Sequence, residues 1–186
     1  MNKIEKLIEE LCPNGVEFKK LGDIAKVLRG KRLVRSELSE DEEYPVFHGG
    51  LEPLGKYSQK NRKANTVMII NVGASAGTVG YSFVDFWSSD GCYCIEESDL
   101  FLSRFMYFVF LGKEKLLQAK VRKAGIPTLD ASVIEKIEVP IPPLAIQREI
   151  VKILDNFTEL EAELEARKKQ YEYYRNKLLT FKERTA

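Results

Sequence analysis

The side chains best able to do chemistry are one histidine and three cysteines, and their spacing favours neither catalysis nor a metal site. Cys92 and Cys94 are separated by one residue, whereas Cys12 and His48 lie far from them in the sequence. A zinc site needs more ligands at paired spacing, and an odd number of cysteines does not indicate a disulfide framework. We therefore expect buried, reduced thiols. His48 has no serine, cysteine or carboxylate motif beside it, which is more typical of a loop or surface-contact residue than of a catalytic base.

A glycine-rich stretch at 73–80 follows a strand-like apolar run, as the phosphate loop of a nucleotide-binding protein would. It lacks the Gly-Lys-Ser/Thr of a P-loop and the spacing of a dinucleotide fingerprint. Residues 78–83 again have a strand pattern, so no helix N-terminus follows to hold a phosphate. We predict a tight hairpin turn. Because no methyltransferase, nuclease or ATPase motif is found either, we expect a non-catalytic chain that binds no metal or cofactor itself.

The charges are nearly balanced, with 29 Lys and Arg against 28 Asp and Glu. This balance excludes the strongly basic composition of the simplest nucleic-acid binders, but it does not exclude a basic face. Two basic clusters, the first at residues 29–35 and the second at 56–63, are predicted as loops and would supply such a face. The second mixes lysines with a tyrosine and amides, as nucleic-acid contact surfaces do. The alternative interpretation of both clusters is an ordinary solvated surface with no binding role. The same alternative applies to the basic residues of 113–123 and to the acidic run 37–43. The candidate DNA contacts are Arg29, Lys31, Arg32, Arg35, Lys56, Lys60, Arg62 and Lys63.

The elements that must position these groups form an α+β fold. We predict a mixed, β-rich globular body over residues 1–143 and one long coiled-coil helix over 144–186. A short amphipathic helix at 4–11 ends at a Cys-Pro-Asn-Gly turn. The pattern further predicts strands at 16–18, 67–72, 78–83 and 91–95, helix within 99–121 with a break near Gly112, and an extended segment at 137–143 closed by prolines.

The helix from Leu144 onward contains no glycine or proline, and its apolar residues recur in steps of four and three for five heptads. At roughly 1.5 Å per residue, residues 146–181 would make a helix about 54 Å long. A lone helix cannot bury such a seam, so it either folds back on its own body or pairs with another chain. Its length and regularity favour pairing. The predicted dimer interface is Ile146, Ile150, Ile153, Phe157, Leu160, Leu164, Arg167, Tyr171, Tyr174, Leu178 and Phe181, with Arg167 as the single polar break.

Several segments together resemble the specificity (S) subunit of type I restriction-modification systems. The most specific are GIPTL at 125–129 and IEVPIPPLAIQREIV at 137–151, which runs into the long helix. In that family this block joins a target-recognition domain to a spacer helix. LCPNGV at 11–16 and the segments 72–81 and 87–92 also resemble the family's entry and recognition strands. Family members typically carry two recognition domains and two helices, so this chain resembles a half-length subunit or a fragment.

The resemblance implies that residues 1–143 bind the major groove at one half-site of double-stranded DNA. It also implies an antiparallel coiled-coil homodimer, modification (methyltransferase) subunits docked on the helix, and a restriction subunit contacted indirectly. S-adenosylmethionine, ATP and Mg²⁺ are then expected only in those partners, where DNA methylation takes place. The alternative is a coiled-coil adaptor that binds only protein. We also expect a cytoplasmic protein, because the N-terminus is charged and the longest apolar run, 105–111, is too short to span a bilayer.

Overall fold

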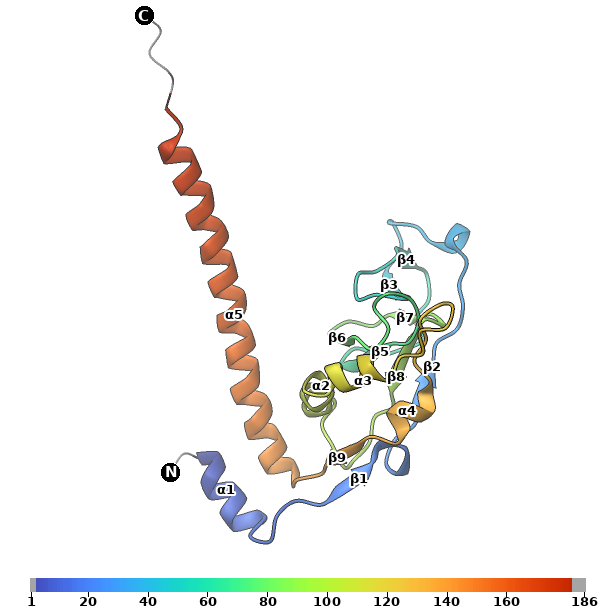
Figure 1. The fold of residues 1–186 in the computed structure, drawn as a ribbon, viewed down its shortest axis with the longest axis vertical. Coiled ribbons are helices and arrows are strands. Elements are labelled where there is room, and N and C mark those ends of the chain that lie inside the picture. Colours follow the sequence, from blue (N-terminus) through green and yellow to red (C-terminus); the bar gives the residue numbers. More distant parts are fainter. Residues whose placement is uncertain (1–2, 182–186) are drawn as a thin grey trace, which may run out of the picture.

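The computed structural model describes residues 3–181 and shows a mixed α+β body from which one long helix projects (Figure 1). The α+β fold class is therefore confirmed. The helices are α1 (Lys3–Leu11), α2 (Ser103–Leu111), α3 (Glu114–Ala119), α4 (Ala131–Glu135) and α5 (Leu144–Leu179), with single 3-10 turns at Leu21–Asp23 and Arg35–Glu37. The strands are β1 (Phe18–Lys20), β2 (Val27–Arg29), β3 (Tyr44–Phe47), β4 (Lys56–Tyr57), β5 (Thr66–Ile70), β6 (Val79–Ser82), β7 (Trp87–Ser88), β8 (Cys92–Ile95) and β9 (Glu138–Pro140).

An antiparallel sheet in the order β2-β8-β5-β6 forms the centre of the body. Strand β5 is buried along its whole length, which explains its unbroken apolar sequence. The glycine-rich stretch connects the antiparallel strands β5 and β6 as predicted, but residues 71–78 form an eight-residue loop and not a tight turn. Gly77 has φ of +91°, and a Cβ there would lie 2.8 Å from the backbone nitrogen of Gln118, so the loop packs directly on α3.

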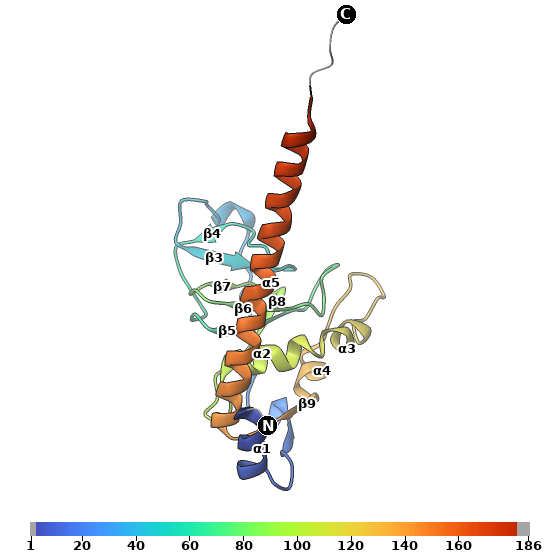
Figure 2. The ribbon, with the colours of Figure 1, turned by 90° about the vertical axis from the view of Figure 1, so that its left-hand side faces the viewer.

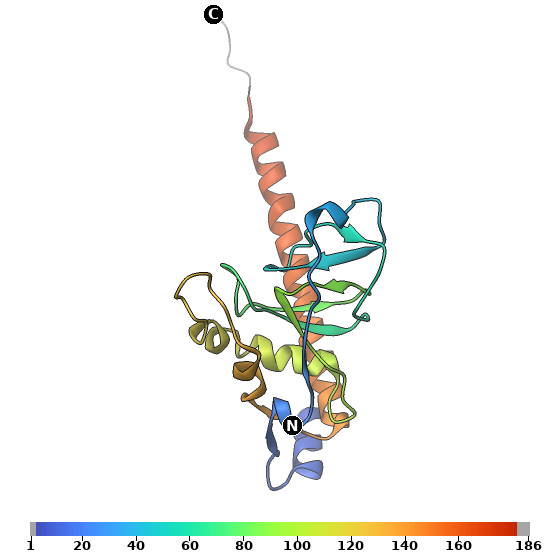
Figure 3. The same cartoon turned by 90° about the vertical axis from the view of Figure 1, so that its right-hand side faces the viewer.

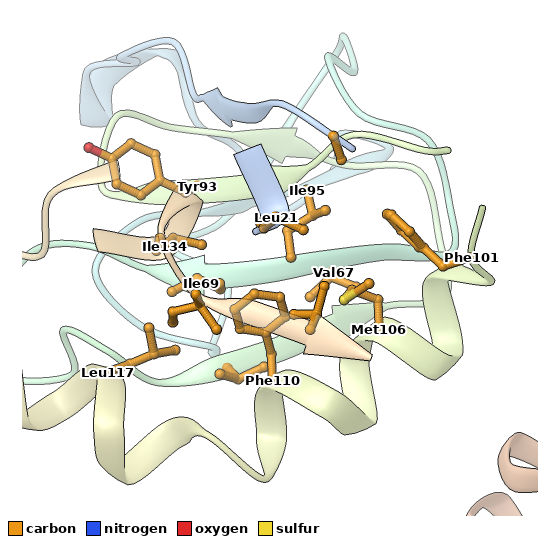
Figure 4. Close-up of a cluster of buried hydrophobic side chains, with 14 of the residues drawn as sticks. Leu21, Val67, Ile69, Tyr93, Ile95, Phe101, Met106, Phe110, Leu117 and Ile134 are labelled. Carbon is orange, nitrogen blue, oxygen red and sulfur yellow. The ribbon is translucent and has the colours of Figure 1, made fainter. Parts of the chain in front are cut away.

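The hydrophobic core lies on both faces of β5, because successive side chains of a strand point to opposite sides. Val67 and Ile69 face α2, α3 and α4 in the cluster shown in Figure 4. Met68 and Ile70 belong to a second cluster on the other face. Members of the first cluster include Leu21, Tyr93, Ile95, Phe101, Met106, Phe110, Leu117 and Ile134, and members of the second include Phe47, Phe86, Cys92 and Cys94.

Two smaller sheets complete the body. In the sheet β4-β3-β7, β3 runs parallel to β7. In the other, β1 pairs with β9 through the antiparallel register Phe18↔Pro140 to Lys20↔Glu138. This pairing places the segment after α1 beside the proline-rich segment that leads into α5. The strand predicted at 16–18 therefore begins two residues later, at Phe18, where its partner β9 is available.

Helix α5 divides into a part that packs on the body and a part that projects away from it (Figures 1 and 2). Ile146 is only 1% exposed, and Ile150 and Val151 pack against the core. This corrects the interface prediction for Ile146, whose side chain is already covered by its own chain. Phe157 is 59% exposed, and each residue from Asn156 to Phe181 is exposed to solvent.

The helix also ends earlier than predicted. Leu179 is its last residue, so Phe181 lies beyond the helix. The prediction that Phe181 belongs to the helical seam was therefore wrong. Residues 182–186, which we included in the predicted helix, fall outside the described residues. Between residues 3 and 181, no helix combines the length and apolar character that crossing a membrane requires.

Candidate nucleic-acid interface

The two basic clusters predicted from the sequence meet at strand β7. The indole Nε1 of Trp87 donates to the carbonyl of Lys31 (2.7 Å), and the amide of Lys31 donates to the carbonyl of Ser88 (2.9 Å). From the second cluster, Asn61 donates through Nδ2 to the Ser88 carbonyl (2.9 Å) and accepts from the Ser88 amide (2.7 Å). The segment leading to the first cluster runs up one side of the sheet (blue in Figure 3). The fold thus brings two clusters that are separated in the sequence to the same strand, β7.

Arg62 holds these two clusters together. Its guanidinium donates to the carbonyl of Asn61 (2.7 Å) and to the carbonyl of Arg29 (2.9 Å), one from each cluster. The buried Nε has no hydrogen-bond partner among the described residues. This differs from the exposed position expected for a DNA contact, because the side chain lies between the clusters. Arg62 therefore acts as a structural link that shapes the surface.

The other seven candidates differ in how accessible they are. Arg29 and Lys56 lie in strands β2 and β4 and not in loops, and Lys56 is half-buried. Lys60 forms an ion pair with Asp85, and its hydrogen bond to that carboxylate raises the pKa of Lys60. Its charge is partly balanced within the protein. Among these candidates, Arg29, Lys31, Arg32, Arg35 and Lys63 are exposed and form no ion pair with another described residue.

A surface hollow of about 490 Å³ lies beside the first cluster, where Arg32 and Arg35 meet His48 and Asp90. The Nδ1 of His48 accepts a hydrogen bond from the amide of Gly91 (3.1 Å). Asp90 Oδ1 lies 3.2 Å from the same Nδ1. The hollow combines two guanidinium donors, an imidazole and a carboxylate, which are groups that pair with base edges and phosphates. From the sequence, His48 is interpreted as a loop or DNA-contact residue, and there is no signal for Asp90.

The glycine-rich stretch and the two neighbouring cysteines take part in structural interactions. The Glu114 carboxylate accepts from the amide of Val79 (2.9 Å) in the glycine-rich stretch, so this amide is not free for a phosphate. Cys92 and Cys94 are buried and reduced, as predicted. A hydrogen bond with Cys94, together with burial, raises the pKa of the Cys92 thiol. Over residues 3–181, no three histidine, cysteine or carboxylate side chains converge in a way that would hold a metal ion.

The junction between the body and α5 is built around Gln147, which is fully buried. Its Oε1 accepts from the amide of Leu102 (2.8 Å), and its Nε2 donates to the carbonyls of Leu100 (2.9 Å) and Pro142 (2.8 Å). These bonds connect the first turn of α5 to the segment before α2 and to the prolines before α5. The glutamine that follows the Pro-Pro-Leu sequence therefore has a structural role that its spacing alone did not reveal.

Comparisons with known proteins agree with this architecture. Residues 13–171 match the family model for the type I restriction modification DNA specificity domain. A Haemophilus influenzae protein named as a type I restriction enzyme specificity subunit is 32% identical over 97% of this chain and 49% of its own length. The MjaVIII specificity subunit of Methanocaldococcus jannaschii is 26% identical over 80% of this chain and 37% of its own length.

Solved structures share the fold. A crystal structure of the S subunit of a type I restriction-modification system from M. genitalium superposes with a TM-score of 0.71 at 21% identity, over 89% of this chain and 46% of that one. This chain thus spans about half the length of the relatives that it matches. The matched family model covers both the body and most of α5, and on this ground the chain belongs to the family of type I restriction-modification DNA specificity domains.

Proposed function

We propose that residues 1–143 recognise one half-site in double-stranded DNA for a type I restriction-modification complex. The observation that carries the proposal is the convergence of the two basic clusters on β7, beside the hollow that contains Arg32, Arg35, His48 and Asp90. Exposed arginines and lysines would bind phosphates and set the register. Donors and acceptors in the hollow would then read base edges in the major groove.

The chemistry would belong to partner subunits. We propose that this chain is non-catalytic and that modification subunits bring S-adenosylmethionine and the methyl-transfer reaction. ATP and Mg²⁺ would be used by the restriction subunit, which this chain would contact only indirectly. The near-neutral composition fits a recognition subunit that shares DNA contact with larger partners, because non-specific affinity depends mainly on the number of phosphates neutralised.

The exposed part of α5 would pair with a second copy of the chain. Leu160 and Leu164 are 58% and 55% exposed, and they continue the exposed part of the apolar seam, which begins at Phe157. An antiparallel pair of these helices would bury the seam and place two recognition bodies about a two-fold axis. Symmetric half-sites would follow. The modification subunits would dock on the paired helices.

Binding to a pool of random-sequence duplexes, measured across a salt series with the modification subunit present, tests this function. A recognition subunit should select a bipartite motif and lose affinity steeply as salt rises. The alternative, a protein-binding coiled-coil adaptor, predicts no selected motif and no salt-dependent affinity for duplex DNA. Absence of DNA binding with the modification subunit present would exclude the proposed function.

A further inference from the structure

Arg104 and Asp155 join helix α2 of the body to helix α5. Asp155 Oδ1 accepts a hydrogen bond from Nε of Arg104 (2.7 Å) and lies 2.7 Å from Nη2 of the same guanidinium. The Arg104 side chain is only 15% exposed and that of Asp155 is 37% exposed. The two residues are 51 positions apart in the sequence, so this contact exists only in the folded chain.

Aromatic rings hold the guanidinium of Arg104 in place. Its Cζ lies 4.7 to 5.0 Å from the ring centroids of four residues, which come from both the β6 region and α2. A planar cation enclosed by rings in this way has few alternative orientations, because it interacts with their π-faces. The enclosing residues are Tyr81, Phe83, Tyr107 and Phe108.

This contact is a second polar attachment of α5 to the body, in addition to the packing of Ile146, Ile150 and Val151 on the core. The first is Gln147, whose three hydrogen bonds fix the first turn of the helix. Asp155 lies eight residues further on, about 12 Å along the axis at 1.5 Å per residue. Between these two points Ile150 and Val151 pack on the core, and Asp155 extends the attachment of the helix further along its axis. The ion pair Lys3–Glu149 also contacts α5, but the Lys3 side chain is 71% exposed, so water competes for it.

We propose that Arg104 is a positioning residue that acts through Asp155 to fix the direction of α5 relative to the recognition body. It thereby fixes the number of base pairs between the two half-sites that a paired assembly accepts. The proposal rests on the proposed function, because it requires two bodies connected through paired helices.

A small change of direction at this contact has a large effect at the far end of the helix. The 24 residues from Asp155 to Leu179 span about 36 Å. A rotation of about 5° at Asp155 moves the end of such a helix by about 3 Å, close to the rise of one DNA base pair. Each added base pair also rotates a half-site by about 35° around the DNA axis. Accepting a neighbouring spacer therefore requires the joint to allow both this displacement and this rotation, and a loosened joint should allow both more readily.

The test maps methylated motifs in a host that lacks other methylation and expresses the chain with its modification subunit. The variants are Asp155→Asn, which keeps the side-chain shape, and Arg104→Met, which keeps an apolar filling between the rings. The matched control is Lys19→Gln. It removes a salt bridge to Glu17 that lies within one short segment and joins no two elements.

We expect the unchanged chain and the control to select one spacer length. Both variants should keep the same half-site sequences, and the preference for one spacer over its neighbours should fall several-fold. A variant that keeps a single spacer, or that loses all methylation while melting at the unchanged temperature, would overturn the positioning role. If Asp155→Asn does not fold, Asp155→Glu moves the carboxylate by one methylene and should change the preferred spacer; an unchanged spacer then counts against the proposal.

The failure of the proposed function would look different. In that case the unchanged chain itself would select no bipartite motif, before any variant is compared.

Discussion

The side-chain carbonyl of Gln147 accepts a hydrogen bond from the backbone amide of Leu102 at 2.8 Å. One residue at the start of the long helix thus completes the backbone hydrogen bonding of a segment 45 positions earlier. Gln147 has no exposed surface, so its amide depends entirely on these partners. A buried polar group is stable only when it is hydrogen-bonded, so a substitution of Gln147 that removes these bonds should destabilise the junction.

Replacing Gln147 with leucine should lower the free energy of unfolding by about 2–4 kcal/mol, because it leaves the amide of Leu102 and two carbonyls without partners. Chemical denaturation measures this change. The control is Gln170→Leu, which makes the same substitution at an exposed position of α5, where an effect within about 0.5 kcal/mol is expected. Equal stability of the two variants would show that the Gln147 bonds contribute little.

The double substitution Leu160→Glu with Leu164→Glu should convert a dimer into a monomer, because four glutamates would face one another across the paired seam. Sedimentation measures the mass. The matched control is Ala162→Glu with Ala166→Glu, which introduces the same charges on the other face of the same helical turns. Dissociation of the control, or an unchanged mass of the leucine variant, would contradict pairing through this seam.

Arg32→Gln and Arg35→Gln should each weaken DNA binding and reduce the magnitude of the slope of log affinity against log salt by about 1, as expected for the loss of one phosphate contact. Folding stability should not change, because both side chains are exposed. Lys115→Gln is an exposed control outside the proposed surface. Salt-series binding together with thermal unfolding distinguishes these effects, and a control as impaired as the two arginine variants would argue against a defined surface.

Arg62→Gln, unlike the substitutions of Arg32 and Arg35, should lower the folding stability, because the Arg62 guanidinium binds the carbonyls of Asn61 and Arg29. We expect a loss of about 1–3 kcal/mol in unfolding free energy, as for hydrogen bonds to a charged group. Denaturation of the free protein measures it without any DNA. A variant of unchanged stability with impaired DNA binding would show that Arg62 contacts DNA after all.

Asp85 should contribute stability that is lost in acid. Its hydrogen bond from Lys60, with a second from the amide of Ala64, lowers the pKa of the carboxyl from its usual 3.8. Since the folded pKa lies below the unfolded one, the contribution is present above the unfolded value and disappears as the pH falls through the folded value. Asp85→Asn should therefore be less stable than the unchanged protein at neutral pH, and the difference should shrink in acid.

Urea unfolding at a series of pH values checks this prediction, with Asp99→Asn at an exposed position as the control. The pKa of Lys60 is raised by the same hydrogen bond, so at alkaline pH the contribution should be lost only as the pH rises through the folded value of the lysine. A stability difference that stays constant from neutral to acid pH would show that the carboxylate charge is not what Asp85 contributes.

The sequence alone predicted the elements that depend on local patterns. The apolar run of β5, the glycine-rich connection between β5 and β6 and the break at Gly112 between α2 and α3 all follow from residues close together in the chain. The long helix was equally clear, because its seam repeats over many turns. The buried cysteines followed from their chemistry and spacing.

What only the tertiary structure decided are the relationships between distant residues. Strand β1 forms where β9 lies beside it, Arg62 turns inward because carbonyls from both clusters meet there, and Ile146 is buried by its own body. Each outcome depends on a partner supplied by another part of the chain, and a periodic pattern shows that a residue needs a partner without showing which one. The sequence therefore determined that α5 carries an apolar seam, and the fold decided where along that seam its own body ends and an exposed surface begins.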